Sequence, residues 1–369
     1  MSRMTGMKKF TILAALMLAA FACKPAETPN ADTTTKNAPA ATGATITING
    51  AGATFPYPIY SKWFDQYHTA HPNVQINYQS IGSGGGIKQL SAQTVFFGAT
   101  DGPMNDEQLK SAPGPILHFP AVLGGVVPIY NVPGVTSQLH FSGALLADIY
   151  LGKITKWNDA RIAKENAGVK LPATDIAVVH RSDGSGTTNA FTSYLDTVNA
   201  EWHTSVGKGK EVNWPVGNGA PGNDGVSAGV KQTDGGVGYV ELQYAVVSGL
   251  SSAAVKNANG KFVQGSSAGV TAAAEGAVDA FPADFRAAPI INGAGDDTYP
   301  IAAYTYLLVY VDQQDATKGQ ALVAFIYWAL TDGQNEEKAI GYAPLPEPIR
   351  AKALEELHQV TTGGAAIWP

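Results

Sequence analysis

Apolar positions recur along most of the chain at the spacing of a helix or of a strand. Tyr60, Trp63, Phe64 and Tyr67 stand at i, i+3, i+4 and i+7, which predicts a helix over 58–68 with one apolar face. An aromatic stripe at this spacing is typical of a helix that packs into a core, not of a cofactor site. We therefore expect this helix to support the fold.

Short runs rich in β-branched and aromatic residues alternate with helical patterns. Strands are expected at 74–78, 176–180 and 301–311. A second helix is expected to present an apolar face formed by Phe191, Tyr194, Leu195 and Val198. This alternation predicts an α/β protein with largely parallel sheets. About 325 residues of such pattern exceed one hydrophobic core, so two lobes are expected.

The first 22 residues have the pattern of a secretory signal. Two lysines precede a largely apolar run over 10–22, which is shorter than the roughly twenty residues of a membrane-spanning helix. The sequence Ala-Phe-Ala at 20–22 fits ordinary signal peptidase, whereas Ala22 before Cys23 resembles a bacterial lipoprotein box. Both interpretations stay open, and we favour a lipid anchor at Cys23.

Residues 23–44 are rich in proline, threonine and alanine and contain no large apolar side chain. Such a segment cannot bury enough surface to fold, so it is expected to be a disordered linker. The stretch 216–225, rich in glycine and asparagine, is expected to be a surface loop within the folded part.

Charge and composition narrow the class of protein. The 24 Lys and Arg against 30 Asp and Glu give a net charge of -6, which disfavours nucleic-acid binding. A single cysteine excludes an internal disulfide. The only long apolar run is the one near the start, so several membrane spans are excluded. The 41 glycines predict many tight turns and close backbone approaches.

Three segments place glycines and a hydroxyl residue next to the start of a helical pattern, namely 52–55, 82–86 and 183–188. At a helix start the unpaired N–H groups and the positive dipole end attract an anion, and glycine allows it to approach the backbone. Each segment alone is better explained as an ordinary helix cap, since serine and threonine cap helices in many proteins. Their repetition favours an anion-binding site.

Arg181 ends a buried strand and leads directly into the third segment. Its guanidinium group matches paired oxygen atoms of a phosphate or carboxylate group, although a surface arginine at a strand end is an equal alternative. Asp183 is expected either to orient Arg181 or to cap the turn. Because neighbours on a strand point to opposite faces, His180 should point away from Arg181.

Asp101 follows the strand-like run 95–100 and precedes a Gly-Pro turn. A carboxylate beside an anion is favourable only if the anion carries a proton that the carboxylate can accept. At neutral pH phosphate keeps a proton and sulfate keeps none, so a buried Asp101 would discriminate between them. A simple turn aspartate is the competing interpretation.

Catalytic signatures are missing from the sequence. It has no phosphate loop of the GxxxxGK[ST] type and no HExxH zinc pair. A triad of His180, Asp183 and Ser185 is disfavoured by the expected direction of His180. No carboxylate or cysteine near His68 and His71 completes a metal shell, so both are expected to be solvated.

The chain resembles the phosphate-binding proteins of bacterial ABC-type phosphate importers, the PstS family, over roughly 45–350. The motifs that carry the resemblance are GAGATFPYPIY, IGSGGGIKQ, FGATDGPM, RSDGSGTTNAFTSYL, VNWPVGNGAPGNDGV, GVGYVE and GYAPLP. The resemblance implies the periplasmic-binding-protein fold (type II), in which hinge strands join two α/β lobes around a ligand cleft. It implies lobe I at 45–120 plus about 300–369 and lobe II at about 121–299.

Carried over position by position, the resemblance implies a set of phosphate ligands. They are Thr54, Phe55 through its backbone, Ser83, Asp101, Arg181, Ser185, Gly186 and Thr187. The chain departs from the family pattern at three nearby positions, Phe96, His180 and Gly84. Phe96 and His180 are not at ligand positions. Gly84 stands where some members have a serine that can make a minor contact with the ligand.

The implied function is high-affinity binding of inorganic phosphate outside the inner membrane and delivery to the permease subunits of an ABC importer. The resemblance implies a monomeric periplasmic protein without catalytic activity, cofactor or metal. A phosphatase-like enzyme that uses the same anion site and a receptor for sulfate or another oxyanion are the alternatives.

Overall fold

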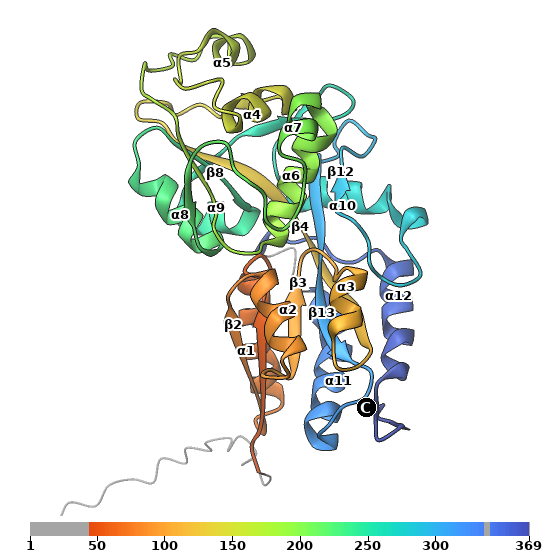
Figure 1. The fold of residues 1–369 in the computed structure, drawn as a ribbon. Helices are drawn as coiled ribbons and strands as arrows, with labels where there is room; N and C mark the ends of the chain where they lie inside the picture. The colour runs from red at the N-terminus through yellow and green to blue at the C-terminus, as the bar shows by residue number, and fades with distance from the viewer. Residues whose placement is uncertain (1–43, 336–339, 369) are drawn as a thin grey trace, which may run out of the picture. The chain divides into compact units, whose positions relative to one another are not determined.

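Within residues 44–335 and 340–368, which the computed structural model describes, ten strands form one mixed sheet (Figure 1). Its continuous path runs in the order β2-β1-β3-β13-β4-β8-β6-β7, with β12 added to β13 and β9 added to β4. The strands are β1 (Ile46–Gly52), β2 (Val74–Ser80), β3 (Phe97–Thr100), β4 (Ile116–Asn131), β6 (Ala177–Arg181), β7 (Asn218–Ala220), β8 (Gly236–Glu241), β9 (Ser251–Ser252), β12 (Ile290–Ile291) and β13 (Ile301–Tyr310).

The predictions for the signal segment, for Cys23 and for all but the last residue of the linker lie outside the described residues. No helix in the described ranges is both long and apolar enough to cross a bilayer.

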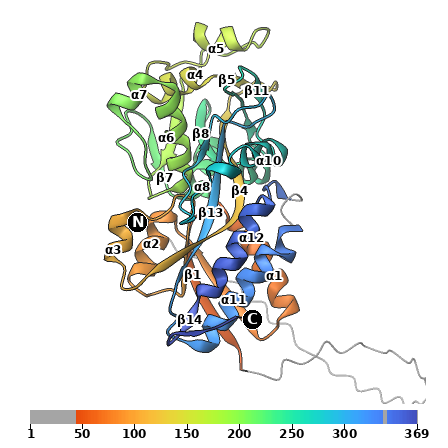
Figure 2. The same ribbon diagram turned by 90° about the vertical axis from the view of Figure 1, so that its right-hand side faces the viewer.

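Helices cover the part of this sheet that contains β1, β2 and β3 and the part that contains β6, β7 and β8. They are α1 (Tyr57–Ala70), α2 (Ser83–Ser91), α3 (Asp106–Ser111), α4 (Gly143–Tyr150), α5 (Ala160–Glu165), α6 (Gly186–Val198), α7 (Ala200–Ser205), α8 (Gly222–Gln232), α9 (Leu242–Ser248), α10 (Ser267–Glu275), α11 (Ala316–Leu330) and α12 (Glu347–Glu356). Figure 2 shows α1, α11 and α12 beside the part of the sheet that contains β1, and α6 and α8 beside β8.

Shorter elements complete the described chain. They are the strands β5 (His140–Phe141), β10 (Ala254–Lys256), β11 (Phe262–Val263), β14 (Thr361–Thr362) and β15 (Ala365–Ala366), and the 3₁₀ helices η1 (Val278–Ala280), η2 (Asp332–Asn335) and η4 (Leu357–Gln359).

The outer parts of the sheet are parallel as expected, but its centre is not. Strand β1 pairs in parallel with β2 and β3, and β6 pairs in parallel with β7 and β8. The long strands β4 and β13 instead run antiparallel to each other and to their outer neighbours β8 and β3. The expectation of largely parallel pairing therefore fails at the two strands that link the parallel groups.

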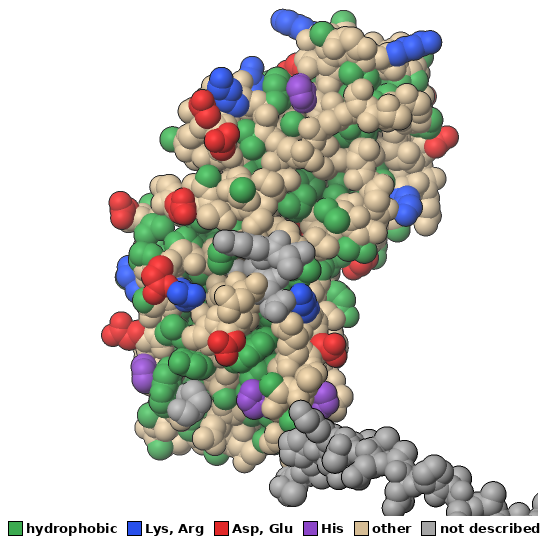
Figure 3. Space-filling view, turned by 180° about the vertical axis from the view of Figure 1, so that it is seen from behind, with side chains coloured by type: hydrophobic (Ala, Val, Ile, Leu, Met, Phe, Trp, Pro, Cys, Tyr) green, Lys and Arg blue, Asp and Glu red, His purple; other side chains and the backbone are tan. Residues whose placement is uncertain are grey.

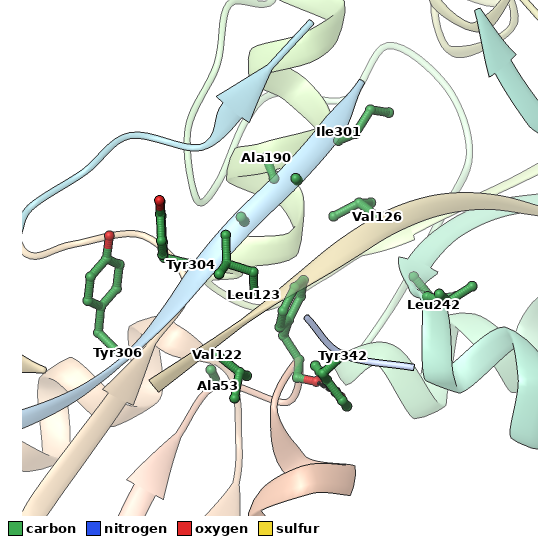
Figure 4. Packing of buried hydrophobic residues seen from close by; sticks show 14 of the residues in the cluster. Ala53, Val122, Leu123, Val126, Ala190, Leu242, Ile301, Tyr304, Tyr306 and Tyr342 are labelled. Carbon is green, nitrogen blue, oxygen red and sulfur yellow. Dashed lines mark hydrogen bonds between the residues drawn. The ribbon is translucent and has the colours of Figure 1, made fainter. Parts of the chain in front are cut away.

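Strand β4 is buried along nearly its whole length and changes partner midway. Its residues from Ile116 to Gly125 pair with β13, and those from Val126 to Asn131 pair with β8. Figure 4 shows side chains of β4 and β13 close together in the core, among them Leu123. One continuous strand thus contributes to the packing of both parts of the sheet.

The expected aromatic helix is present as α1. Tyr60, Trp63 and Tyr67 are buried and Phe64 is half-buried, so the 3.6-residue periodicity identified the inward face correctly. The indole N–H of Trp63 donates to the carbonyl oxygen of Gly333 at 3.0 Å, which satisfies its polar group inside the core.

Helix α6 likewise confirms the second predicted apolar face. Phe191, Tyr194 and Leu195 are buried, and Val198 is half-buried at its end. The ring of Phe191 stacks on that of Tyr239 in β8 with centroids 4.3 Å apart. This contact packs α6 against β8, the strand that pairs with β6.

Candidate functional site

All the side chains that the sequence singled out for an anion lie in one buried cluster. Strands β1 and β3 are parallel neighbours, so their carboxyl ends deliver adjacent loops to the same edge. Strand β6 and helix α6 approach this edge from the other part of the sheet. The side chains of the cluster are almost fully buried; they are Thr54, Ser83, Asp101, Arg181, Ser185 and Thr187.

Ser83 joins three of the segments. Its Oγ accepts from the backbone N–H of Asp101 at 3.2 Å and from that of Gly186 at 3.1 Å. The contact with Gly186 connects α2 to the first turn of α6, which are far apart in sequence. The loops expected to share a ligand therefore contact one another directly.

Asp101 is buried and retains hydrogen-bond donors on both carboxylate oxygens. Thr305 donates to Oδ1 at 2.8 Å, and Ser83 lies 3.4 Å from Oδ2. Burial raises the pKa of Asp101 from 3.8 to about 7, although the hydroxyl of Thr305 and the charge of Arg181 favour its ionised form. Near neutral pH this carboxyl group is therefore poised to hold or to release a proton.

Arg181 is oriented by Asp183. Its Nε donates to Oδ1 of Asp183 at 2.8 Å and its Nη2 donates to Oδ2 at 2.5 Å, a two-pronged pairing that fixes the guanidinium plane. Burial opposes ionisation of Asp183, but hydrogen bonding and the charge of Arg181 outweigh it and lower the pKa of Asp183. Asp183 also accepts from the backbone N–H of Gly222 at 3.0 Å. Of the two expected roles, orientation of Arg181 is confirmed.

Helix α6 begins at the cluster with a serine cap. Ser185 Oγ accepts from the backbone N–H of Thr188 at 3.0 Å, so the N-terminal amides of a 13-residue helix point into the site. A Cβ atom at Gly186 would lie 2.4 Å from Cβ of Asp101. Glycine is therefore required here because the helix start and the Asp101 loop touch.

The loop after β1 is held by three tyrosine hydroxyls that donate to three consecutive carbonyl oxygens. The pairs are Tyr78 with Ala53 at 2.8 Å, Tyr244 with Thr54 at 2.5 Å and Tyr342 with Phe55 at 2.6 Å. Because the C=O and N–H of a trans peptide point in opposite directions, fixing the carbonyl of Thr54 also fixes the N–H of Phe55.

The second glycine-rich segment differs from its expected form. Helix α2 begins at Ser83, so the three glycines after it lie inside the first turns instead of preceding the helix. A Cβ atom at Gly86 would lie 2.4 Å from Cα of Gly52, which means that α2 packs directly on β1. The backbone N–H of Gly84 donates to the carbonyl oxygen of Gly184 at 2.8 Å and makes a further connection across the cluster.

The site contains a residue that the sequence analysis assigned wrongly to a surface loop. Asn223 stands at the start of α8 and is fully buried, and its side chain bridges Thr54 and Thr187. The expectation that 216–225 is an exposed loop is wrong at this end because Gly222 and Asn223 open a helix that packs into the site. The motif PGND before an amphipathic run was the signal available.

Lys210 and Thr305 were also missed. Lys210 Nζ donates to the carbonyl oxygen of Pro103 at 2.7 Å, and its charge acts on Asp101. Burial lowers the pKa of Lys210 to about 8. Beside it lies a groove of about 670 Å³ that is lined by Gly102, Lys210 and Arg286 among others. Neither residue belongs to a local motif, so only the tertiary structure identifies them.

The histidines take no part in the cluster. His180 stacks on Trp214 with ring centroids 4.8 Å apart, on the opposite face of β6 from the guanidinium of Arg181, so a catalytic triad is not supported. His68 and His71 are exposed and bond to nearby carbonyl oxygens through their rings. In the described residues no group of three or more His, Cys, Asp or Glu side chains could hold a metal ion.

Comparison with known proteins identifies close relatives. Residues 32–332 match the PBP superfamily domain. The chain is 45% identical over 311 residues to the phosphate-binding protein PstS of Xylella fastidiosa, covering 84% of both chains. It is 44% identical over 325 residues to the phosphate-binding protein PstS of Pasteurella multocida, covering 87% of this chain and 93% of that protein.

The fold also matches solved structures. The phosphate-binding protein of Stenotrophomonas maltophilia superimposes with a TM-score of 0.65 at 21% identity, covering 84% of this chain and 94% of that one. At this identity the match concerns the fold alone. It confirms the expected fold class, an α/β architecture of two lobes.

Proposed function

Since the chain belongs to the PstS family of phosphate-binding proteins within the PBP superfamily, we propose that it binds inorganic phosphate with high affinity and delivers it to an ABC-type importer. The relatives named for phosphate binding are similar over more than four-fifths of the chain. The buried cluster of donors around Asp101 and Arg181 supplies independent physical support.

The proposed ligand set is the one that the sequence implied. It comprises the hydroxyls of Thr54, Ser83, Ser185 and Thr187, the backbone N–H groups of Phe55 and Gly186, the guanidinium of Arg181 and the carboxylate of Asp101. Seven of these eight groups donate hydrogen bonds, which suits a tetrahedral oxyanion whose oxygens are mostly acceptors.

The single observation that carries the proposal is the buried carboxylate of Asp101 among those donors. It repels an oxyanion unless a proton lies between the two, and its pKa of about 7 allows that proton to be shared near neutral pH. Phosphate carries such a proton and sulfate does not. Fully ionised sulfate beside an ionised Asp101 would leave two buried negative groups in contact, so sulfate could bind only if Asp101 first took up a proton, whereas phosphate brings its own.

Long-range attraction plays little part in this binding. The protein carries a net charge of -6, and Figure 3 shows acidic and basic side chains interspersed over the face it presents. Arg181 shares its charge with Asp183. Fixed N–H dipoles and hydroxyls therefore supply most of the stabilisation, as at other dehydrated anion sites.

We propose that lobe I comprises 45–120 plus about 300–369 and lobe II about 121–299. On this division each lobe supplies about half of the ligands, because Thr54, Ser83 and Asp101 precede residue 121 and the Arg181 segment follows it. Phosphate would thus stabilise the closed arrangement of the two lobes. Direct bonds between the lobes, such as Lys210 to Pro103, add to this closure.

The proposed role is transport without catalysis. The curated relatives are named for phosphate binding, and we assign the hydroxyls of Thr305 and Ser83 that donate to Asp101 to orienting and binding the ligand, not to nucleophilic attack. The alternative of a phosphatase-like enzyme is tested by incubating purified protein with a chromogenic phosphate ester. Turnover above the blank would contradict a purely binding role.

The proposed location is the periplasm of a bacterium, with the protein monomeric and its permease in the inner membrane. Residues 1–22 would direct export, and Cys23 would carry the lipid anchor after cleavage. Mass spectrometry of the mature N-terminus tests this proposal. A diacylglyceryl mass on Cys23 is expected, and an unmodified N-terminus would leave export without an anchor.

The decisive test of function is titration of the protein with phosphate and with sulfate, followed by calorimetry and tryptophan fluorescence. We expect micromolar or tighter binding of phosphate and at least 10⁴-fold weaker binding of sulfate, on the order seen when a site requires a ligand hydrogen that the analogue lacks. Equal affinity for the two anions would favour the alternative of a general oxyanion receptor.

A further inference from the structure

Asn223, at the start of α8, makes three hydrogen bonds to residues of the proposed site. Its backbone N–H and its Nδ2 donate to Oγ1 of Thr54 at 3.2 and 2.7 Å, and Nδ2 also donates to Oγ1 of Thr187 at 3.3 Å. Its Oδ1 accepts from the backbone N–H of Glu241 at 2.9 Å. The residue is fully buried, so all of these groups depend on protein partners.

The direction of the Asn223 amide follows from its partners. A backbone N–H donates and never accepts, so the atom that faces Glu241 must be the amide oxygen. The NH₂ group then necessarily faces the two threonines. With one hydrogen directed to each hydroxyl, Asn223 has no alternative orientation that satisfies the same three neighbours.

This orientation restricts the threonine hydroxyls. A hydroxyl group has two lone pairs and one proton. Oγ1 of Thr54 receives two hydrogen bonds from Asn223, and Oγ1 of Thr187 receives one from Asn223 and one from Nη1 of Arg181 at 3.4 Å. Within the described ranges neither hydroxyl donates to a protein acceptor. With their lone pairs engaged, both can still donate their protons to an acceptor in the site.

We infer that Asn223 is a positioning residue that turns the hydroxyl protons of Thr54 and Thr187 toward the phosphate oxygens. This inference rests on the proposed function and deepens it. Asn223 itself need not touch the anion, because it acts by occupying the lone pairs of groups that do.

The same pattern extends to Ser83, whose Oγ accepts from the N–H groups of Asp101 and Gly186. All three hydroxyls are thus engaged as acceptors, but Ser83 also donates its proton to Oδ2 of Asp101 at 3.4 Å, whereas in the described residues no protein acceptor takes the protons of Thr54 and Thr187. Asp101 is then the group to which an incoming anion can donate its proton. The substrate class that fits is a tetrahedral oxyanion with one proton, and Asn223 contributes to that selectivity by keeping two hydroxyls from accepting it.

The test is a double-mutant cycle in the full-length protein, with phosphate affinity measured by calorimetry and the unfolding temperature measured without phosphate. Asn223→Ala is combined in turn with Thr54→Val and with Thr187→Val, which keep the side-chain shape and remove the hydroxyl. We expect Asn223→Ala alone to weaken phosphate binding about tenfold, the size of one hydrogen-bond contribution. In either valine background its effect should be clearly smaller, because one hydroxyl that it orients is absent.

A merely structural role gives a different result. If Asn223 only stabilises the start of α8, the fold-loss of phosphate affinity in each double variant will equal the product of the losses in its two single variants. Such independence would overturn the inference. A wild-type protein that binds no phosphate would overturn the proposed function and this inference with it. Normal wild-type binding with independent losses would overturn the inference alone.

Asn223→Asp provides a second test that does not depend on the alanine variant being folded. It keeps the size of the side chain but replaces a donor with an acceptor, so both threonine protons should turn away from the ligand. The matched control for its added charge is Asn189→Asp, beside Gly102 in the groove next to the site. We expect Asn223→Asp to weaken phosphate binding at least about tenfold more than the control, by loss of two donors. Equal losses in the two variants would refute the positioning role.

Discussion

Replacing Asp101 with asparagine should shift the stability of the ligand-free protein progressively in favour of the variant as the pH rises from 4 to about 7. In the wild type, burial raises the pKa of Asp101 from 3.8 to about 7. A carboxyl group whose pKa is higher in the folded state favours folding below its unfolded pKa, and this contribution is lost as the pH rises to the folded value. The asparagine side chain of the variant does not titrate in this range, so its contribution to stability stays constant.

The magnitude follows from the two pKa values. At 1.36 kcal/mol for each pH unit, a rise from 3.8 to about 7 corresponds to a change of about 4 kcal/mol in the free energy of unfolding, as an upper figure. The quantity to compare is the change with pH of the difference in unfolding free energy between variant and wild type, because the constant cost of exchanging the two side chains then cancels.

Urea denaturation of phosphate-free protein at several pH values between 4 and 8 measures this difference. It should grow in favour of the variant up to about pH 7 and level off above it. Asp183→Asn serves as the contrasting variant, because pairing with Arg181 lowers the pKa of Asp183. Its wild-type carboxylate contributes stability above the unfolded pKa that is lost toward acid, so that variant should be less stable at neutral pH. A flat difference for Asp101→Asn would refute the reasoning.

Three further predictions concern binding. Arg181→Ala should weaken phosphate binding by at least 100-fold in calorimetry, because it removes the one ligand with a formal positive charge and leaves Asp183 unpaired; wild-type affinity would remove Arg181 from the site. Asp101→Asn should narrow the preference for phosphate over sulfate in competition titrations, and an unchanged ratio would argue against proton sensing. Gly186→Ala should weaken phosphate binding more than tenfold, since its Cβ would meet Asp101 at 2.4 Å, whereas Gly114→Ala, with only an ordinary contact at 3.6 Å, should bind as the wild type does.

The parts of the fold with strong periodicity were predictable from sequence. The apolar faces of α1 and α6 were assigned correctly because a 3.6-residue repeat of large side chains has few other solutions. Strand β4 was not predicted, although it is the longest in the sheet. It contains two prolines and the pair Gly124 and Gly125, which weaken any strand pattern locally, and its partners far along the chain compensate for this.

The candidate site was predictable as far as its local motifs reach. Arg181, Asp183 and Ser185 are close in sequence, and their geometry follows from a strand that ends at a capped helix. Asn223 and Thr305 become neighbours of the site only when distant segments meet. The motif PGND predicts at most a helix start at Asn223, and Thr305 lies in no local motif. The three glycines of α2 have low helix propensity, so the sequence alone did not predict them inside a helix. They are accommodated because α2 packs closely on β1.

The change of partner along β4 limits how the two parts of the molecule can move. Because one unbroken strand is registered to β13 before Gly125 and to β8 from Val126, sliding of one part past the other would break both ladders at once. Twisting near the two glycines breaks neither. One strand therefore sets the register of both parts of the sheet, and with it the spacing between the loop that carries Asp101 after β3 and the end of β6 at Arg181.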